Sequence, residues 1–343
     1  MKHTMMERAD LVPPPCGAVR DHREVVRALE AAVADNLALL APLDRAWQPS
    51  DYLPDMGSEH WQEEVGAFRR TAEAVSDELL VALVGGMVTE EALPLYSVSL
   101  NGLVGDDEGT SAAPWARWLR GWTAEENRHG DVLNAYLRLT GRVDMRAVER
   151  TVHALIAEGF NPKSRADPYR LLVYTAFQER ATCVAHGNLA RLAGAAGEPN
   201  LARICGTIAG DEARHGTFYS RMMEAVLDHD PAGGIVAVRA MLRGLIAMPG
   251  RLMEDGGGPD LFGRFAAVAQ RAHVYTAHDY ASIVGHLVET WNIGRRAVTG
   301  TAATAQDELC RQAERCGRLA DRLSASIDER PPMAFSWIHN RRI

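Results

Sequence analysis

Two short acidic stretches of the chain have nearly the same sequence and carry residue types that bind transition metals. In each stretch a Glu precedes a His by three positions. The pairs are Glu126 with His129, and Glu212 with His215. Residues three apart in an α-helix lie on one face, so both side chains of a pair reach a single metal ion. Each stretch therefore provides half of a metal site.

Two further glutamates complete a four-helix pattern. Glu90 lies 36 positions before Glu126. Glu179 lies 33 positions before Glu212. These separations suit two helical hairpins with arms of about 25 residues, in which a lone Glu faces a Glu-x-x-His across a short turn. Two lone Glu residues and two Glu-x-x-His motifs are the ligand set of ferritin-like di-iron and di-manganese proteins. Periodicity alone does not decide between Glu90 and its neighbour Glu91.

The simpler interpretation of a single Glu-x-x-His pair is a solvated charge pair on a helix surface. Here the residues before the motifs, at 121–124 and 208–210, are small or apolar. We therefore expect both motifs on buried helices, where carboxylates need a compensating charge. The repeat as a whole favours a metal pair.

The composition predicts a helical protein. The 343 residues are 47% hydrophobic but only 6% aromatic, which favours an all-α over an all-β fold. No apolar run is expected to reach the roughly 18 residues that a membrane helix needs, since the best candidate, 79–88, is short. We therefore expect no membrane insertion.

Charge and cysteine content narrow the class further. A net charge of −8 argues against a nucleic-acid partner, because such proteins carry basic surfaces. The first residues lack the composition of a signal or transit segment. Five cysteines without a C-x-x-C motif fit a reducing compartment. These features predict a cytoplasmic protein.

The chain is expected to form one domain over residues 21–343, preceded by an irregular arm over residues 1–20, where Pro13-Pro14-Pro15 forbids a helix. The pair Gly85-Gly86 predicts close packing against a neighbouring helix, and the apolar segment 331–338 is expected to dock on the bundle. Helices are predicted at 21–40, from 61, and at 79–101, 115–140, 145–158, 169–193, 200–227, 235–249, 261–290 and 304–324.

Several longer motifs resemble those of the soluble, plant-type acyl-carrier-protein desaturases. The resemblance runs from about Trp47 to the C-terminus. The motifs are WQP at 47–49, TEEALP at 89–94, WTAEENRHGD at 122–131, GRVDMR at 141–146, FQERAT at 177–182, ICGTIA at 204–209 and FSWI at 335–338.

This resemblance implies an all-α, ferritin-like di-iron bundle with additional helices, and it selects Glu90 over Glu91. It also implies that Thr182 lies beside the oxygen-binding face of two iron ions. Trp47 and Asp211 would lie on the route of electrons from ferredoxin. The implied iron ligands are Glu90, Glu126, His129, Glu179, Glu212 and His215.

The implied reaction is insertion of a cis double bond into a saturated acyl chain on acyl carrier protein, with O₂ and two electrons. Relatives also suggest a homodimer. A di-iron hydroxylase or oxygenase on the same scaffold stays open as an alternative. A ferritin-like metal storage protein is the alternative from another class, although the loop around Trp47 and the long C-terminal region speak against it.

Three further expectations concern the surroundings of the metal site. The pseudo-symmetry of the motifs suggests that Asp211 orients His129, and that Glu125 orients His215. By resemblance, Ser99, Gly102 and Leu171 surround the acyl tunnel. The candidates for a basic surface that meets an acidic carrier are Arg142, Arg146, Arg150 and Arg264.

Overall fold

The chain folds into a bundle of α-helices. The computed structural model describes residues 21–104, 106, 108–256, 260–325 and 331–343. Among these residues the only extended pairing is one isolated bridge between Ala334 and Arg342, so the predicted all-α class is confirmed. The helices are α1 (His22–Ala28), α2 (Glu30–Asn36), α3 (Trp61–Ala72), α4 (Asp77–Glu90), α5 (Leu93–Val104), α6 (Pro114–Thr140), α7 (Met145–Glu158), α8 (Pro168–Ala196), α9 (Pro199–His229), α10 (Pro231–Leu242), α11 (Leu261–Arg271), α12 (Ala277–Thr290), α13 (Gly300–Cys310) and α14 (Gln312–Ala325), with short 3-10 helices η1 (Leu37–Leu39), η2 (Pro49–Asp51), η3 (Pro249–Leu252), η4 (Ile293–Arg295) and η5 (Ser336–Ile338).

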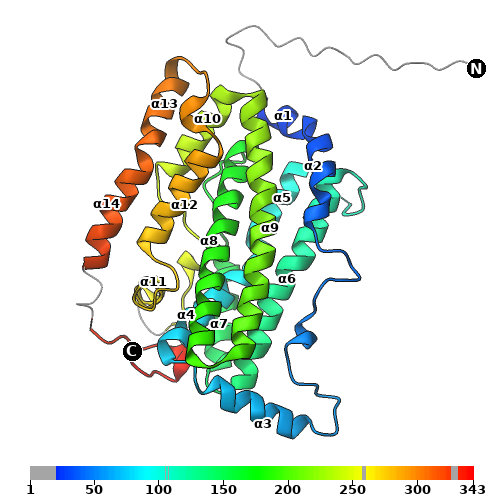
Figure 1. Ribbon diagram of the computed structural model, residues 1–343, viewed down its shortest axis with the longest axis vertical. Coiled ribbons are helices and arrows are strands. Elements are labelled where there is room, and N and C mark those ends of the chain that lie inside the picture. The colour runs from blue at the N-terminus through cyan, green and yellow to red at the C-terminus, as the bar shows by residue number, and fades with distance from the viewer. Residues whose placement is uncertain (1–20, 105, 107, 257–259, 326–330) are drawn as a thin grey trace, which may run out of the picture.

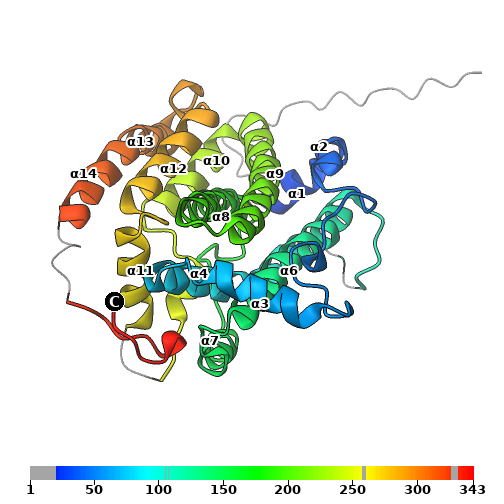
Figure 2. The same cartoon turned by 60° about the horizontal axis from the view of Figure 1, so that its bottom comes forward.

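The centre of the bundle consists of two helix pairs. Helices α8 and α9 form an antiparallel hairpin through the middle of the molecule (Figure 1). Helices α4 and α6 lie in a second layer against this hairpin, and α10, α12, α13 and α14 lie on its opposite side (Figure 2). The connection between α6 and α8 contains α7, which occupies the crossover that the spacing of the motifs predicts.

Local sequence sets the ends of the long helices. Pro114, Pro168 and Pro199 take the first position of α6, α8 and α9, where a backbone N–H would have no partner within the helix. Gly141 ends α6 with a φ of 67°, which residues with a Cβ rarely adopt. Asp144 caps α7 by accepting a hydrogen bond from a backbone N–H of its first turn. The predicted helix at 145–158 is therefore confirmed at both ends.

The helix predicted over 79–101 is wrong in one respect, because it is two helices. Helix α4 ends at Glu90 and α5 begins at Leu93. Pro94 accounts for the break, since a proline ring clashes with the carbonyl group four residues earlier, which here belongs to Glu90. Glu90 therefore lies on the last turn of α4.

The helix predicted over 261–290 is also divided. Thr276 and Asp279 form a capping box that starts α12, in which each side chain accepts a hydrogen bond from the other residue's backbone N–H. The segment between Arg271 and Ala277 is consequently a turn between α11 and α12. The sequence contains this signal, but the continuous apolar periodicity conceals it.

Other predicted ends shift by a few residues. Helix α8 continues past Gly194, and Gly197 ends it with a φ of 88°. A Cβ at Gly194 would lie 3.7 Å from the Cβ of Ala202, so this glycine packs against α9 instead of ending a helix. The predicted helices at 21–40 and 304–324 are each interrupted once, at Leu29 and at Arg311.

Gly85 allows α11 to approach α4. A Cβ at this position would lie 2.1 Å from Cε2 of Phe265, which is closer than two carbon atoms can approach. The predicted close packing is therefore confirmed for Gly85. At Gly86, no described atom outside the backbone of its own helix lies within 4 Å of the corresponding position.

The C-terminal segment docks on the bundle, as predicted. Phe335, Trp337 and Ile338 are fully buried. Trp337 Nε1 donates to Thr151 Oγ1 of α7 at 2.9 Å. Backbone hydrogen bonds between Met333 and Ile343 close the segment into a loop.

One stretch, Asp77–Gly102, is long and apolar enough to cross a membrane, so the expectation that no such run exists is wrong by length. Of its most apolar window, 78% is buried inside the bundle. The stretch also contains the break after Glu90. Its apolar character is accounted for by packing, since all but a few side chains of α4 face other helices.

Buried hydrophobic residues from Val25 to Ile338 form one continuous cluster. The expected irregular arm over residues 1–20 lies outside the described residues. The single domain over 21–343 stays a prediction.

Candidate metal centre

Four helices bring the six predicted ligands to the middle of the bundle. Glu90 comes from α4, the first Glu-x-x-His pair from α6, Glu179 from α8 and the second pair from α9. All six side chains are at most 4% exposed. Residues three positions apart lie on one face of an α-helix, so the Glu and the His of each pair both face inward.

The six side chains form two overlapping groups. Within each group one ligand atom per residue lies within 4.8 Å of the others. Glu126 and Glu212 belong to both groups, whereas Glu90 and Glu179 each belong to one. The groups are Glu90, Glu126, His129 and Glu212, and Glu126, Glu179, Glu212 and His215.

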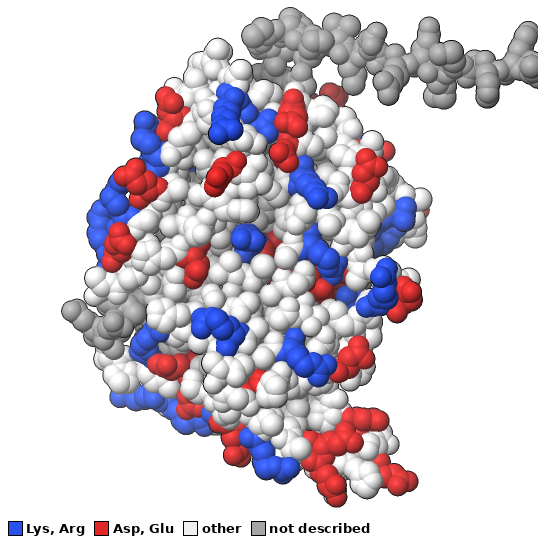
Figure 3. Space-filling view, viewed as in Figure 1, with Lys and Arg blue, Asp and Glu red and all other residues white. Residues whose placement is uncertain are grey.

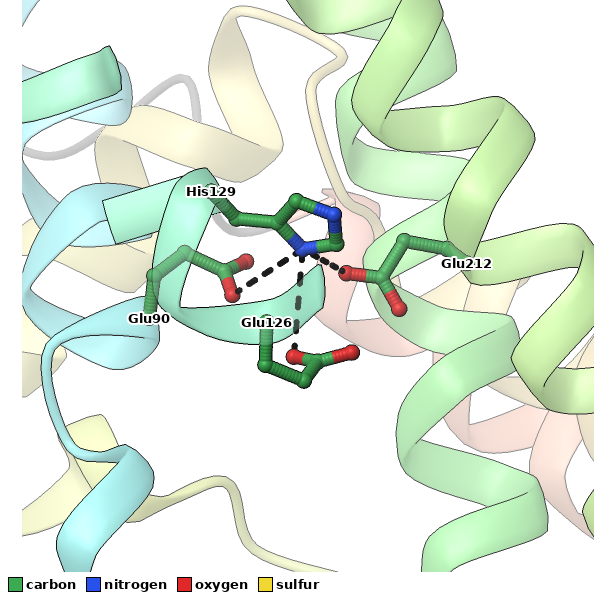
Figure 4. A group of neighbouring side chains, drawn as sticks. All are labelled: Glu90, Glu126, His129 and Glu212. Carbon is green, nitrogen blue, oxygen red and sulfur yellow. Dashed lines mark ion pairs between the residues drawn. The ribbon is translucent and has the colours of Figure 1, made fainter. Parts of the chain in front are cut away.

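Figure 4 shows the first group, in which three carboxylates turn toward Nδ1 of His129. The distances from this nitrogen are 3.3 Å to Glu212 Oε1, 3.8 Å to Glu126 Oε2 and 3.9 Å to Glu90 Oε2. In the second group, His215 Nδ1 lies 2.8 Å from Glu126 Oε1 and 3.5 Å from Glu179 Oε2. The two imidazole rings are 6.1 Å apart between centroids.

Several of these atoms are buried without a hydrogen bond of acceptable geometry to any described residue. They are Glu126 Oε1, His129 Nδ1, both carboxylate oxygens of Glu179, Glu212 Oε1 and His215 Nδ1. Buried polar atoms are nearly always satisfied in folded proteins, so this convergence needs a partner of positive charge. Two divalent cations would balance the four ionised carboxylates. The residues therefore fit a dinuclear metal site.

The electrostatics of the metal-free cluster support the same conclusion. Burial and the neighbouring Glu212 carboxylate raise the pKa of Glu126 to about 7. Burial also raises the pKa of Glu179. For His129 and His215, burial opposes protonation, but hydrogen bonds and the surrounding carboxylates outweigh it and raise each pKa. These shifts favour protonated side chains in the metal-free cluster, and metal binding would compete with those protons.

Both histidines are held by a carboxylate on the far side of the ring, in the arrangement that the pseudo-symmetry suggests. His129 Nε2 lies 3.3 Å from Asp211 Oδ2. His215 Nε2 lies 3.0 Å from Glu125 Oε2. These contacts leave Nδ1 of each ring directed into the cluster.

Arg214 joins the two supporting acids and was not predicted. Its Nη2 donates to Asp211 Oδ1 at 2.6 Å and to Glu125 Oε2 at 2.9 Å. Burial raises the pKa of Asp211, but its hydrogen bond to His129 and other donors outweigh this and hold the pKa below its usual range. For Glu125, burial likewise raises the pKa, but the hydrogen bond from His215 and the other donors outweigh burial and lower the pKa. Arg214 lies in the second motif itself, so its position was visible in the sequence, but its two partners were not.

Trp47 connects this network toward the surface. Its Nε1 donates to Asp211 Oδ2 at 2.9 Å, and the same oxygen faces His129. The indole is half-buried and stacks parallel to the His129 ring, with 6.1 Å between centroids. The guanidinium of Arg128 covers the indole at 5.1 Å from the centroid.

An apolar cavity of about 340 Å³ meets the metal cluster on the Glu90 side. Thr182 lies in its wall, and the Thr182 hydroxyl donates back to the carbonyl groups of Gln178 and Glu179 at 3.1 Å. The rest of the wall comes from α4, α8, α11, α12 and α14, from the segment 245–251 after α10, and from the turn 274–276, and most of it is apolar. The cavity therefore brings a hydrophobic ligand next to one edge of the cluster.

His186 is a residue of the site that the sequence analysis missed. Its Nε2 lies 2.8 Å from Glu90 Oε1, and the side chain is 2% exposed. It lines the apolar cavity together with Thr182. The signal was its spacing, since positions 179, 182 and 186 share one face of α8.

Other expectations about the surroundings are not met. Ser99, Gly102 and Leu171 do not line this cavity. Arg142 is used within the fold, because it donates to backbone carbonyl groups at the end of α3 and to Asp77. 

Arg264 is likewise engaged inside the molecule. It donates to Ala334 O at 2.6 Å and covers the ring of Phe335 at 5.6 Å. Its role in the structure is to hold the C-terminal segment. Of the four predicted basic residues, Arg146 and Arg150 remain exposed on α7.

The fold and the cluster define a helical bundle that fits a dinuclear metal site of carboxylates and histidines. A family model described as fatty acid desaturase matches residues 21–339. The chain belongs to this fatty acid desaturase family.

Curated relatives agree with this assignment. The chain is 50% identical over 327 residues to stearoyl-[acyl-carrier-protein] 9-desaturase 1, chloroplastic, of Oryza sativa subsp. indica, with 93% of this chain and 86% of the relative covered. It is 47% identical over 326 residues to the stearoyl-[acyl-carrier-protein] 9-desaturase, chloroplastic, of Ricinus communis, with 93% and 82% covered.

A solved structure shows the same fold. It is the X-ray structure of DesA2, a candidate acyl-ACP desaturase from Mycobacterium tuberculosis. The two structures align with a TM-score of 0.53 and 20% identity, over 82% of this chain and 99% of that chain.

Proposed function

We propose that this protein is an acyl-carrier-protein desaturase. It would insert a cis double bond into a saturated acyl chain carried by acyl carrier protein, with O₂ and two electrons. The observation that carries this proposal is the apolar cavity that ends at Glu90 and Thr182, directly beside the dinuclear cluster. The named activities of the curated relatives support the same reaction.

The metals in this proposal are two iron ions. Carboxylates with one imidazole per metal suit iron that changes its oxidation state. His129 and Glu90 would bind one ion, and His215 and Glu179 the other, while Glu126 and Glu212 are shared, because each belongs to both groups. The iron pair supplies the oxidising power that side chains lack for breaking an unactivated C–H bond.

The protein's own part is to position the chain and exclude water. An acyl chain in the apolar cavity replaces solvent next to Glu90, Thr182 and His186. A fixed chain presents one pair of methylene groups to the metals, and this geometry sets the position of the double bond. Thr182 and His186 are the polar side chains that α8 contributes to the cavity wall, so the Thr182 hydroxyl is the candidate for contact with oxygen.

The electrons would enter through Trp47, Asp211 and His129. The hydrogen bonds that join these three residues form a continuous path from the half-buried indole to the cluster. Arginines surround the indole, with Arg128 over its ring and Arg214 on Asp211. An acidic one-electron carrier of the ferredoxin type fits such a surface, because complementary charge accelerates encounter.

The carrier protein would dock at the mouth of the apolar cavity, over α14. Leu319 lines the cavity and is 41% exposed. Arg315 lies one turn before Leu319 and Arg322 one turn after it, so the three side chains share one face of the helix. Arg251 of η3 also lines the cavity. An apolar opening flanked by arginines suits an acidic carrier that delivers an acyl chain.

A comparison of two double variants tests this docking site. Reversal of charge in Arg315→Glu with Arg322→Glu should raise KM for the acyl carrier substrate about tenfold or more at low salt, and kcat should change little. The matched control is Arg146→Glu with Arg150→Glu on α7, which removes the same charge elsewhere. If only the α7 variant raises KM, the carrier docks on α7, as the sequence analysis expected.

The chemistry itself is tested by product analysis. Purified protein loaded with iron is incubated with a reductant and acyl carrier substrates of several chain lengths, and the released fatty acids are analysed by mass spectrometry. Loss of two hydrogens at one position supports the proposal, whereas gain of one oxygen identifies a hydroxylase.

We also infer from the resemblance that two copies associate, and sedimentation velocity distinguishes a dimer from a monomer.

A further inference from the structure

A second pocket reaches the metal cluster at Glu212, whereas the apolar cavity reaches it at Glu90. It has a volume of about 260 Å³ and lies between α8, α9 and α12. Its lining includes Glu212, one of the two carboxylates common to both groups, together with the small residues Ala213 and Gly216 on the next turn of α9. Figure 3 views the face of the molecule formed by α8, α9 and α12.

Gly216 brings the floor of this pocket close to the cluster. A Cβ at Gly216 would lie 3.4 Å from the Cβ of Glu179 and 3.8 Å from the backbone nitrogen of Arg180. The pocket therefore reaches one proposed ligand, Glu212, and its wall at Gly216 packs against a second, Glu179. Both carry carboxylate oxygens that are buried and lack a hydrogen bond to any described residue.

The walls of the pocket are more polar than those of the other cavity. Arg180 and Arg221 supply positive charge, and Thr217 and Ser220 supply hydroxyl groups. Arg180 is exposed and makes no hydrogen bond or ion pair with a described residue, whereas Arg221 donates to Asn36.

Two ionisable groups complete the lining. Glu224 is the acid of the outer wall. Burial and the charge of Arg180 lower the pKa of His286, which favours the neutral ring. The positive charge of the pocket therefore comes from Arg180 and Arg221.

We propose that this pocket is a second, polar entrance to the metal centre, which admits water and small anions while an acyl chain fills the apolar cavity. The inference rests on the proposed function in one respect, because it assigns the apolar cavity to the acyl chain. An acyl chain that excludes water from its own cavity also closes that route to small hydrophilic molecules. The pocket at Gly216 offers them a separate path to the Glu179 and Glu212 side.

The test uses azide, a small anion whose binding to ferric iron is followed by its absorption band. Association rates are measured by stopped flow with the oxidised, iron-loaded protein, with and without bound stearoyl carrier protein and in the absence of reductant. In the wild-type protein we expect the bound acyl chain to lower the rate less than about twofold, because the polar entrance stays open.

Two variants close the pocket without changing a proposed ligand. Ala213→Phe and Thr217→Phe each add a ring to its wall, and in both we expect a bound acyl chain to slow azide entry about tenfold or more. The matched control is Gly210→Phe, on the same helix but outside the pocket, where nothing lies within 4 Å of the new Cβ. Iron content and helical circular dichroism verify that each variant is folded and loaded.

Arg180→Gln tests the preference for anions. It should slow azide entry about two- to tenfold at low salt, and the difference should vanish at high salt, because screening removes steering by an exposed charge. If a bound acyl chain blocks azide entry as strongly in the wild-type protein as in Ala213→Phe, the apolar cavity is the common entrance and the proposal is wrong. Carrier binding and iron content are measured separately, so a failure of the desaturase assignment is distinguished from a failure of this entrance.

Discussion

Removal of a shared carboxylate should have a different effect on metal content from removal of an unshared one. Glu212 belongs to both four-residue groups, whereas Glu90 belongs to one. Glu212→Gln takes a ligand from both metal positions, and Glu90→Gln takes a ligand from one. Both substitutions keep the volume of the side chain, so the packing of the bundle is retained. We expect two metals per chain in the wild-type protein, about one in Glu90→Gln and nearly none in Glu212→Gln.

The size of the effect follows from the burial of the cluster. Two unit charges 4 Å apart interact by about 4 kcal/mol at an effective dielectric constant of about 20. A divalent ion doubles this energy. Every 1.4 kcal/mol is a factor of ten in affinity. Loss of a ligand should therefore weaken metal binding by more than the roughly 10–100-fold that is typical for loss of a supporting residue. Glu125→Gln, which changes a supporting residue, provides the comparison.

The assay is the metal-to-protein ratio, measured by plasma mass spectrometry after anaerobic loading with ferrous iron and removal of free metal. The matched control is Glu91→Gln, which changes the neighbouring carboxylate that hydrogen-bonds to Asn134 outside the cluster. It should retain two metals. Equal metal content in Glu90→Gln and Glu212→Gln, or loss of metal in Glu91→Gln, would refute the assignment of shared and unshared ligands.

Three further predictions concern electron entry, pH and the C-terminal segment. Trp47→Phe removes the hydrogen bond to Asp211 and should slow reduction of the metal pair by a one-electron carrier about tenfold, with unchanged metal content in the same preparation. The pKa of Glu126 is raised to about 7 in the folded protein, whereas the unfolded chain releases this proton near pH 4.5. Between these two pH values the metal-free folded protein therefore holds one proton more than the unfolded chain. Its free energy of unfolding should consequently fall by roughly 3 kcal/mol as the pH rises from 4.5 to 7. Metals replace that proton, so the gain in melting temperature on loading should grow between pH 5 and pH 7, and a constant gain would contradict the pKa assignment. Trp337→Phe leaves Thr151 without its indole donor and should lower the free energy of unfolding in urea by about 1 kcal/mol, with no change in iron content.

Residue spacing predicted the parts of the site that lie on helices. A Glu-x-x-His pair faces one way on any helix, so the inward direction of both pairs followed from the sequence. The same reasoning placed Asp211 and Glu125 behind the opposite histidines, because the two motifs are repeats. Those contacts join residues more than 80 positions apart, yet the symmetry of the repeat was enough to indicate them.

Contacts between unrelated segments could not be read from the chain. Arg142 and Arg264 looked like surface charges because periodicity does not show which backbone carbonyl groups lie within reach. His186 was missed because its partner, Glu90, lies on another helix at a distance of 96 residues. Pro94 and the capping box at Thr276 were visible, but the apolar periodicity that spans both breaks outweighed them.

A single turnover with oxygen-18 gas, the iron-loaded reduced protein and stearoyl carrier protein tests the proposed desaturation directly. The expected product is a fatty acid that has lost two hydrogens and carries no label, since the oxygen leaves as water. Oxygen-18 in the fatty acid would contradict desaturation and identify a hydroxylase. Iron oxidation without any change in the acyl chain would also contradict desaturation and point to metal storage.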